Sequence, residues 1–214
     1  MRLLIGTRNR GKFIEIAEVL SGLPLILTMP QDVGIADDPT ETGATFLENA
    51  MEKASHYFER SKLPTIADDS GIIVEALADE LGIATRRWGA GPQASDEEWI
   101  EHFLQRMKKE KNKRARFVCA LAYIDAARKT CTFEGICDGV ITPRLEAGYL
   151  PGLPISACFM PDGFDRVYSA MTIEQKNSTS HRGRAVHKLA DHLRRTLGST
   201  KKCSWGSSTP AAPH

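Results

Sequence analysis

The chain has 214 residues, of which 42% are hydrophobic and 26% charged, enough for one soluble domain with a full core. Its net charge of +1 excludes a global field that would attract nucleic acid or an anionic membrane, so any anion-binding site must be local. No run of about 18 apolar residues could span a membrane, and five cysteines without a C-x-x-C motif or a signal-peptide h-region predict a cytoplasmic protein with reduced thiols.

The first predicted strand, residues 2–6, leads into a polar loop and then a helix. Apolar residues at positions 13, 16, 17 and 20 recur at helical spacing. A loop at a helix N-terminus has free backbone N–H groups and the positive end of the helix dipole, which favour a polyphosphate. Side chains that could add hydrogen-bond donors or charge are Thr7, Arg8, Asn9, Arg10 and Lys12, with Gly11 among them. A solvated turn is the alternative.

A second strand is predicted at 23–29, followed by an acidic loop at 30–42. Thr45 and Glu48 form a capping-box pattern that starts a helix at 45–61. Lys53 lies on one flank of that helix. Glu41 comes just before the cap, where its carboxylate could face a cleft shared with later acids, although a lone loop glutamate is usually solvated.

Residues 65–71 read as a strand, a tight acidic turn at Asp68 and Asp69, and a second strand. Adjacent carboxylates repel each other, so a buried pair needs a cation or a proton between them. At a strand end, a divalent metal is the natural cation. An exposed turn closed by Ser70 and Gly71 is the alternative.

The rest of the chain predicts further helices and strands. They are a helix at 95–109, a β-hairpin of 116–124 and 130–141, a short apolar segment at 153–159, a helical turn at 171–176, and a last helix at 182–197 with Ser180 as N-cap. Residues 198–214 lack periodicity and predict a disordered tail.

Several short motifs, each weak by itself, follow one another along the chain. Together, in this order, they resemble the inosine triphosphate pyrophosphatase family over residues 2–197. They are Thr7-x-Asn9-x-x-Lys12, Glu41-Thr42-Gly43-x-Thr45-Phe46, Glu48-Asn49-Ala50 with Lys53, Ala67-Asp68-Asp69-Ser70-Gly71, Arg116-Phe117, Lys176-Asn177 and Ser180-His181-Arg182.

The resemblance implies an α/β fold of two lobes around a long, curved, mixed sheet with helices on its faces, and an active cleft between the lobes. Residues 1–197 would form this single domain, usually as a homodimer. Asp69 would be general base and metal ligand, with Glu41 and Asp68 helping to hold Mg²⁺. The 7–12 loop, Lys53 and Ser70 would bind the triphosphate, and Lys176, His181 and Arg182 the nucleotide.

The chain departs from the family at the base pocket, where its residues are Leu153, Pro154, Ile155 and Ser156. Ile155 replaces an aromatic residue that would stack on the purine, and Ser156 replaces an aspartate that would accept from the ring N–H. Stacking is worth about 1–3 kcal/mol, and a hydrogen bond to a charged group about 1.5–3 kcal/mol. This departure predicts a changed base selectivity; a pocket that still recognises 6-oxopurines through His181 and Arg182 is the alternative.

The predicted function is therefore hydrolysis of a nucleoside triphosphate, an abnormal purine or one with a changed base, to monophosphate and pyrophosphate. Water would attack the α-phosphorus with Mg²⁺ assistance, without nucleic acid or membrane partners. A catalytically weak nucleotide-binding or regulatory protein, and a related pyrophosphatase of different base selectivity, are the alternatives.

Overall fold

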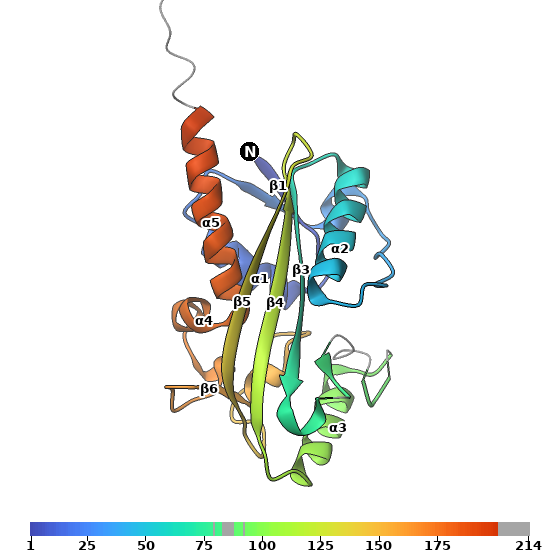
Figure 1. The fold of residues 1–214 in the computed structure, drawn as a ribbon, viewed down its shortest axis with the longest axis vertical. Coiled ribbons are helices and arrows are strands. Elements are labelled where there is room, and N and C mark those ends of the chain that lie inside the picture. Colours follow the sequence, from blue (N-terminus) through green and yellow to red (C-terminus); the bar gives the residue numbers. More distant parts are fainter. Residues whose placement is uncertain (79, 83–87, 92, 201–214) are drawn as a thin grey trace, which may run out of the picture.

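The computed structural model describes residues 1–78, 80–82, 88–91 and 93–200, and its centre is one mixed sheet of six strands (Figure 1). The strand order is β2-β1-β3-β4-β5-β6, parallel among β2, β1 and β3 and antiparallel from β3 onward. The strands are β1 (Arg2–Ile5), β2 (Ile26–Thr28), β3 (Thr65–Val74), β4 (Arg114–Ile124), β5 (Thr130–Ile141) and β6 (Phe159–Pro161).

Five α-helices are described around this sheet, and short 3₁₀ turns link them. The α-helices are α1 (Arg10–Leu20), α2 (Phe46–Ser61), α3 (Asp96–Lys108), α4 (Ile173–Thr179) and α5 (His181–Thr200). The 3₁₀ turns described are Pro30–Val33, Glu75–Leu77, Pro154–Ala157 and Tyr168–Ala170. The predicted capping box of Thr45 with Glu48 is confirmed at the start of α2, and a second capping box, Ser95 with Glu98, begins α3. None of the described helices is long and apolar enough to cross a membrane.

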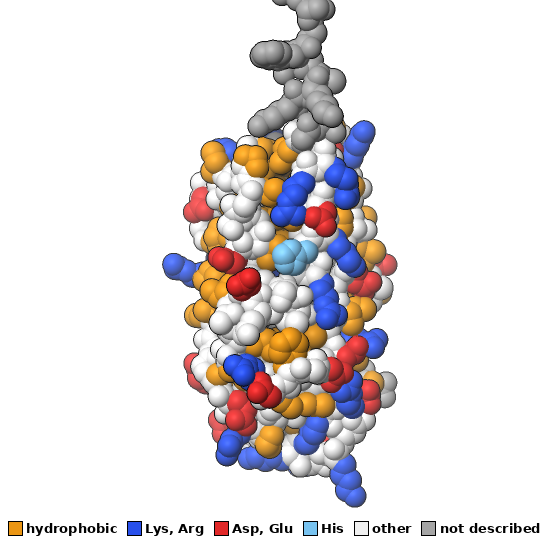
Figure 2. Space-filling view, turned by 90° about the vertical axis from the view of Figure 1, so that its left-hand side faces the viewer, with side chains coloured by type: hydrophobic (Ala, Val, Ile, Leu, Met, Phe, Trp, Pro, Cys, Tyr) orange, Lys and Arg blue, Asp and Glu red, His pale blue; other side chains and the backbone are white. Residues whose placement is uncertain are grey.

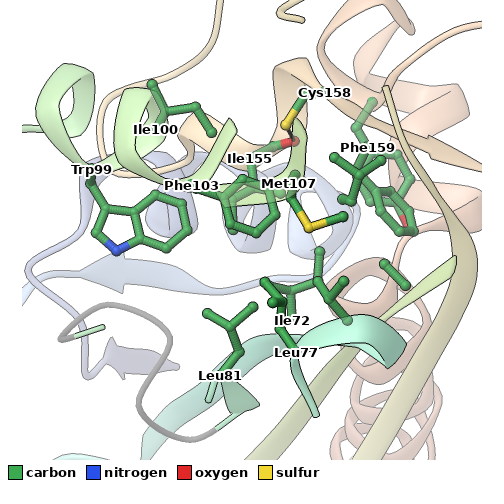
Figure 3. Packing of buried hydrophobic residues seen from close by; sticks show 14 of the residues in the cluster. Ile72, Leu77, Leu81, Trp99, Ile100, Phe103, Met107, Ile155, Cys158 and Phe159 are labelled. Atoms are coloured by element: carbon green, nitrogen blue, oxygen red, sulfur yellow. Dashed lines mark hydrogen bonds between the residues drawn. The ribbon is translucent and has the colours of Figure 1, made fainter. Parts of the chain in front are cut away.

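The helices divide the molecule into two lobes that share the long strands β3, β4 and β5. In the upper lobe of Figure 1, α1 and α5 cover one face of the sheet, and α2 covers the other. In the lower lobe, α3 packs on the far end of β3 around the stacked rings of Trp99 and Phe103, with Ile155 and Phe159 beside them (Figure 3). The predicted two-lobed fold around a long mixed sheet is confirmed.

The expected acidic turn at Asp68 and Asp69 is wrong, because β3 runs unbroken through both residues. Asp68 lies opposite Leu121 of β4, and Asp69 lies opposite Ala120. Successive side chains of a strand point to opposite faces of the sheet, so the two carboxylates separate without a turn. Cations from different helices contact the two carboxylates. The positions of these residues along the sequence do not reveal that arrangement.

Several element boundaries also differ from those predicted. Helix α1 begins at Arg10, because the side chain of Asn9 accepts a hydrogen bond from the backbone N–H of Lys12 and caps the helix there. The helical turn predicted at 171–176 is the complete helix α4. Helix α5 continues to Thr200, and residues 201–214 of the predicted tail lie outside the described residues.

The N-terminus of α5 is held in place by two close contacts. The Ser180 hydroxyl accepts from the backbone N–H of Gly183 (3.0 Å), which confirms Ser180 as the N-cap. Gly135 of β5 lies directly under this first turn. A Cβ atom at Gly135 would stand 1.9 Å from the backbone oxygen of His181, so only glycine permits this approach.

Charged side chains of both signs are interspersed on the face that α5 presents to solvent (Figure 2). In that view, lysine and arginine side chains alternate with acidic and hydrophobic ones. This distribution agrees with the low net charge of the chain, and it leaves anion binding to a local site.

The close approach at Gly135 predicts that Gly135→Ala destabilises the protein. Overpacking of this kind costs about 1–3 kcal/mol, because the backbone of α5 must shift to admit the methyl group. Urea unfolding measures the loss. Gly148→Ala is the control, since a Cβ at Gly148 meets nothing within 4 Å. Equal unfolding free energies for the two variants would contradict the prediction.

Candidate active site

A cleft of about 430 Å³ lies where the two lobes meet, and it collects most of the predicted site residues. The predicted residues that line it are Thr7, Arg8, Asn9, Lys12, Glu41, Lys53, Asp68, Asp69, Ser70, Leu153, Pro154, Ile155, Ser156, Lys176, His181 and Arg182. The structure thus brings together residues that are far apart in the sequence.

Two members of the predicted phosphate loop lie elsewhere. Arg10 is exposed and does not line the cleft. Gly11 is buried beneath the segment that follows β5, where an added Cβ would lie 2.9 Å from both the Pro151 carbonyl oxygen and a Leu153 methyl carbon. Because α1 begins at Arg10, residues 10 and 11 belong to its first turn rather than to the loop. Gly11 permits packing of the lobes instead of lining the cleft.

The remaining loop residues are positioned by local hydrogen bonds. The Thr7 hydroxyl accepts from the backbone N–H of Asn9 (3.1 Å), and the Asn9 amide donates to the Gly152 carbonyl across the cleft (3.1 Å). Arg8 donates to the Ala36 carbonyl (3.0 Å) and keeps an exposed side chain. The start of α1 is therefore tied to the opposite lobe, with Lys12 directed toward the sheet.

Asp68 is fully buried and is neutralised from the α1 and α5 side of the sheet. Its Oδ2 atom lies 3.0 Å from Lys12 Nζ and 3.3 Å from Arg182 Nε, and it accepts from the Ser70 hydroxyl (3.1 Å). Burial alone would raise the pKa of Asp68, but the charges of Lys12 and Arg182 outweigh burial and hold this pKa well below its ordinary value. Asp68 therefore stays ionised inside the protein.

Asp69 faces α2 and is bound by that helix. Its Oδ1 atom lies 2.9 Å from Lys53 Nζ, and its Oδ2 atom accepts from the Asn49 amide (3.1 Å). The same ammonium lies 2.6 Å from Glu41, so one cation joins the two predicted acids. Burial lowers the pKa of Lys53, but Asp69 and Glu41 overcome this effect and raise the pKa above its ordinary value. Lys53 is thus a charged bridge between loop and strand.

Glu15 of α1 was not among the predicted site residues. It is buried, and it pairs with Lys176 Nζ (2.5 Å) and with the guanidinium of Arg182. Burial raises the pKa of Glu15, yet Arg182 and Lys176 together lower it below its usual value. Its sequence position could have indicated this role. Glu15 follows Lys12 by three residues, so both lie on the same face of the helix.

Aromatic side chains form the other end of the cleft, and of these Phe117 and Tyr168 were outside the predicted site residues. The ring of His181 stacks on Phe117 with centroids 4.4 Å apart, and Tyr168 stacks beyond Phe117 at 5.9 Å. Burial and the nearby Arg182 lower the pKa of His181 well below its ordinary value, so the imidazole is neutral. No described residue is a hydrogen-bond partner of its buried Nδ1 atom.

The segment expected to form the base pocket is a 3₁₀ turn, Pro154–Ala157, on the wall of this aromatic end. Ile155 and Ser156 are each only 6% exposed, and Ile155 belongs mainly to the lower core (Figure 3). The Ser156 hydroxyl lies 2.6 Å from the Leu153 carbonyl oxygen and 2.7 Å from the Ser169 hydroxyl. The residues that depart from the family thus lie on the cleft, but their polar atoms face the chain itself.

The acidic residues fit a divalent cation in their chemistry. Among the described residues, no three His, Cys, Asp or Glu side chains form a complete metal-binding group. However, Mg²⁺ is commonly held by one or two carboxylates, with water and substrate phosphate as the other ligands. Glu41 and Asp69 already converge on one cation, the Lys53 ammonium, and Asp68 keeps a buried Oδ1 atom without a hydrogen-bond partner among the described residues.

Comparisons with known proteins agree with this geometry. A model of the Ham1 family matches residues 3–192. The chain is 37% identical over 193 residues to a dITP/XTP pyrophosphatase from Leptospira interrogans, which covers 90% of this chain and 97% of that protein. Among solved structures, the Ham1 protein of Coxiella burnetii matches with a TM-score of 0.78 and 28% identity, over 91% of this chain and 99% of that one. The Staphylococcus aureus Ham1 protein matches with a TM-score of 0.77 and 29% identity, over 92% and 100%. The resemblance inferred from the motifs is confirmed.

The ion pairs of Glu15 predict that Glu15→Gln lowers the free energy of unfolding by about 3–5 kcal/mol at pH 7, because it leaves buried Arg182 and Lys176 without their counterion. Since the folded-state pKa of Glu15 lies below 4.5, its stabilisation is present above pH 4.5 and is lost as the pH falls through the folded-state pKa. Urea unfolding from pH 7 down to pH 4 measures both effects.

Glu18→Gln is the matched control, because Glu18 is an exposed carboxylate on the same helix. We expect this variant to unfold as the unchanged protein does at every pH. If Glu15→Gln and Glu18→Gln have the same stability at pH 7, the buried network contributes nothing and the prediction is wrong.

Proposed function

The chain belongs to the Ham1 family, and we propose that it hydrolyses abnormal purine nucleoside triphosphates to the monophosphate and pyrophosphate. Its relatives from Leptospira interrogans and Treponema denticola carry the name dITP/XTP pyrophosphatase, which names the substrate class. A nucleoside triphosphate is accordingly the expected partner.

The observation that carries the proposal is the pairing of acids and cations in one cleft. Lys12 and Lys53 lie there beside Asp68 and Asp69, and Arg182 contacts Asp68 from a third helix. A triphosphate brings roughly four negative charges, and cations around its oxygens must neutralise them during phosphoryl transfer. A carboxylate in the same cleft can orient and deprotonate water. This combination matches the needs of a pyrophosphatase.

In the proposed mechanism, Asp69 is the general base for the water that attacks the α-phosphorus. General-base catalysis contributes about 10²–10⁴-fold in rate. Asn49 donates to Oδ2 of Asp69 and orients the carboxylate, while Lys53 lies against Oδ1. Lys12 and the N-terminus of α1 bind the phosphates, with Thr7, Arg8, Asn9 and Ser70 around them.

We propose Mg²⁺ as the cofactor, held by Asp69 and Glu41 with Asp68 beside them. When bound, Mg²⁺ would neutralise phosphate oxygens and lower the pKa of bound water. Lys53 would then move from between the two carboxylates to the phosphates. This role agrees with the high pKa of Lys53, which keeps it cationic.

The nucleoside would occupy the other end of the cleft. Lys176, His181 and Arg182 line that end, and Arg182 is held rigidly by Asp68 and Glu15. We also propose a homodimer in the cytoplasm. Four cysteines with described positions are free thiols, which supports a reducing compartment.

A catalytically weak nucleotide-binding protein is the second candidate. One observation favours it: Ile155 and Ser156 replace the aromatic and acidic residues that the family resemblance implies for base binding. The complete set of acids and cations at the phosphate end favours the enzyme, since a binding protein needs no general base.

Asp69→Asn separates these two candidates. The amide cannot accept a proton from water, so we expect the rate of pyrophosphate release from ITP, dITP or XTP to fall at least about 10²-fold. Nucleotide binding, measured by calorimetry, should remain. If the unchanged protein binds these nucleotides with Mg²⁺ present and releases no pyrophosphate, the enzyme reading fails.

Removal of divalent cations gives a separate prediction. We expect an excess of EDTA to abolish pyrophosphate release from ITP and added Mg²⁺ to restore it, because Glu41 and Asp69 converge on one cation position, where Lys53 lies in this structure. Thermal unfolding in EDTA serves as the control and should be unchanged. Undiminished hydrolysis in EDTA would contradict the Mg²⁺ assignment.

A further inference from the structure

The aromatic end of the cleft offers a purine few polar atoms. Its wall near the 3₁₀ turn consists of Leu153, Ile155 and Ser156, with the rings of Phe117 and Tyr168 behind them. Trp99 also lines the cleft. A hypoxanthine or xanthine ring carries N–H donors, and each donor that is buried without an acceptor costs about 1–3 kcal/mol. The acceptors at this end therefore decide which bases fit.

The Ser156 hydroxyl is already used within the chain. It lies 2.6 Å from the Leu153 carbonyl oxygen, where only the hydroxyl can donate, and 2.7 Å from the Ser169 hydroxyl. The side chain is also only 6% exposed. Ser156 therefore closes the 3₁₀ turn, and its donated proton points at the backbone rather than at a ligand.

Backbone carbonyls beside Ser156 are engaged as well. The Leu153 carbonyl accepts from both the backbone N–H and the hydroxyl of Ser156. The Gly152 carbonyl accepts from Asn9, and the Ile155 carbonyl accepts from the backbone N–H of Cys158. These oxygens have partners inside the protein and give no reason to select a base with an N–H at this edge.

Every acidic side chain that lines the described cleft is paired with a cation or a donor elsewhere. Glu15 binds Lys176 and Arg182, and Asp38 accepts from Tyr57. Glu41 and Asp69 share Lys53, and Asp68 binds Lys12 and Arg182. Each of these carboxylates therefore already contacts a cation or a donor of the protein, and a ring N–H would have to compete with that partner; among the oxygens of Asp68 and Asp69, the buried Oδ1 atom of Asp68 alone has no hydrogen-bond partner among the described residues.

The Nδ1 atom of His181 and the hydroxyl of Tyr168 are polar atoms near the rings. Both are buried and have no hydrogen-bond partner among the described residues. A hydroxyl can donate or accept, so Tyr168 does not require a ring N–H either. A neutral imidazole nitrogen either accepts or donates, according to its tautomer. His181 can therefore meet a base edge with or without a ring N–H, and it does not impose one.

We propose that this cleft selects its base by apolar and aromatic contact, so that 6-oxopurine nucleoside triphosphates in which the ring N–H at position 1 is replaced are substrates alongside ITP. The class includes N1-alkylated 6-oxopurine nucleotides, in which a methyl group replaces the donor. This inference rests on the proposed pyrophosphatase function. It adds that Ser156, as a small and internally bonded residue, sets the selectivity.

The test compares ITP with N1-methylinosine triphosphate as substrates of the intact protein with Mg²⁺. Pyrophosphate release gives kcat/KM for each. We expect the two values to differ by less than tenfold. A preference of tenfold or more for ITP would overturn the inference, because it would show that the ring N–H is recognised.

Ser156→Asp gives a second measurement. A carboxylate at this position would accept from a ring N–H and would reject the methylated base, so we expect the preference for ITP to rise at least tenfold. Ser169→Asp is the matched control, because it breaks the same hydroxyl pair without lining the cleft. An equal preference in both variants would argue against Ser156 as the selective residue. If Ser156→Asp does not fold, the ratio in the unchanged protein still decides.

Failure of the proposed function would look different. If neither nucleotide releases pyrophosphate, the pyrophosphatase activity is wrong. The inference on selectivity is then tested by calorimetry, from the ratio of the two dissociation constants, with the same tenfold limit. Release from ITP alone leaves the activity intact and overturns only the inference.

Discussion

The arrangement of Asp68 and Asp69 on one unbroken strand is the constraint on which the rest of the structure depends. Two adjacent carboxylates in a protein interior are costly unless each is paired and hydrogen-bonded. On strand β3 the two carboxylates point to opposite faces of the sheet. There Asp68 pairs with cations from α1 and α5, and Asp69 pairs with Lys53 from α2. The helices around the cleft are thereby tied to one strand, and the same contacts bring together the residues proposed to bind phosphate.

From the sequence, the residues that gather in the cleft were predicted better than the geometry with which they meet there. The acids, the lysines, His181 and Arg182 were expected in one cleft and do line it, because local patterns reveal the strands and helices that carry or precede them. The turn at Asp68 was wrong because a neighbouring pair of acids looks like a turn until their long-range partners are known. Arg10 and Gly11 were predicted in the loop but belong to the first turn of α1, since the cap at Asn9 was not recognised.

Other features could not be predicted from local patterns. Glu15 is a charged residue on a largely apolar helix, and its partners Lys176 and Arg182 come from the other end of the chain. Likewise, the inward hydrogen bonds of Ser156 depend on Ser169 and on the 3₁₀ turn around it. In both cases the sequence identifies the residue, but tertiary packing determines which way its polar atoms point.

The position of Lys53 between Glu41 and Asp69 has a consequence for how the cleft meets its ligand. The described lining contains five acidic side chains (Glu15, Asp38, Glu41, Asp68, Asp69) and five basic ones (Arg8, Lys12, Lys53, Lys176, Arg182), so their formal charges cancel. The cleft therefore offers little net attraction to a simple anion. If Mg²⁺ binds as proposed, a triphosphate that carries its own divalent cation would exchange partners with these ion pairs, its oxygens taking the cations and its metal ion taking the carboxylates. Such an exchange would favour a metal-complexed polyphosphate over free phosphate or other anions.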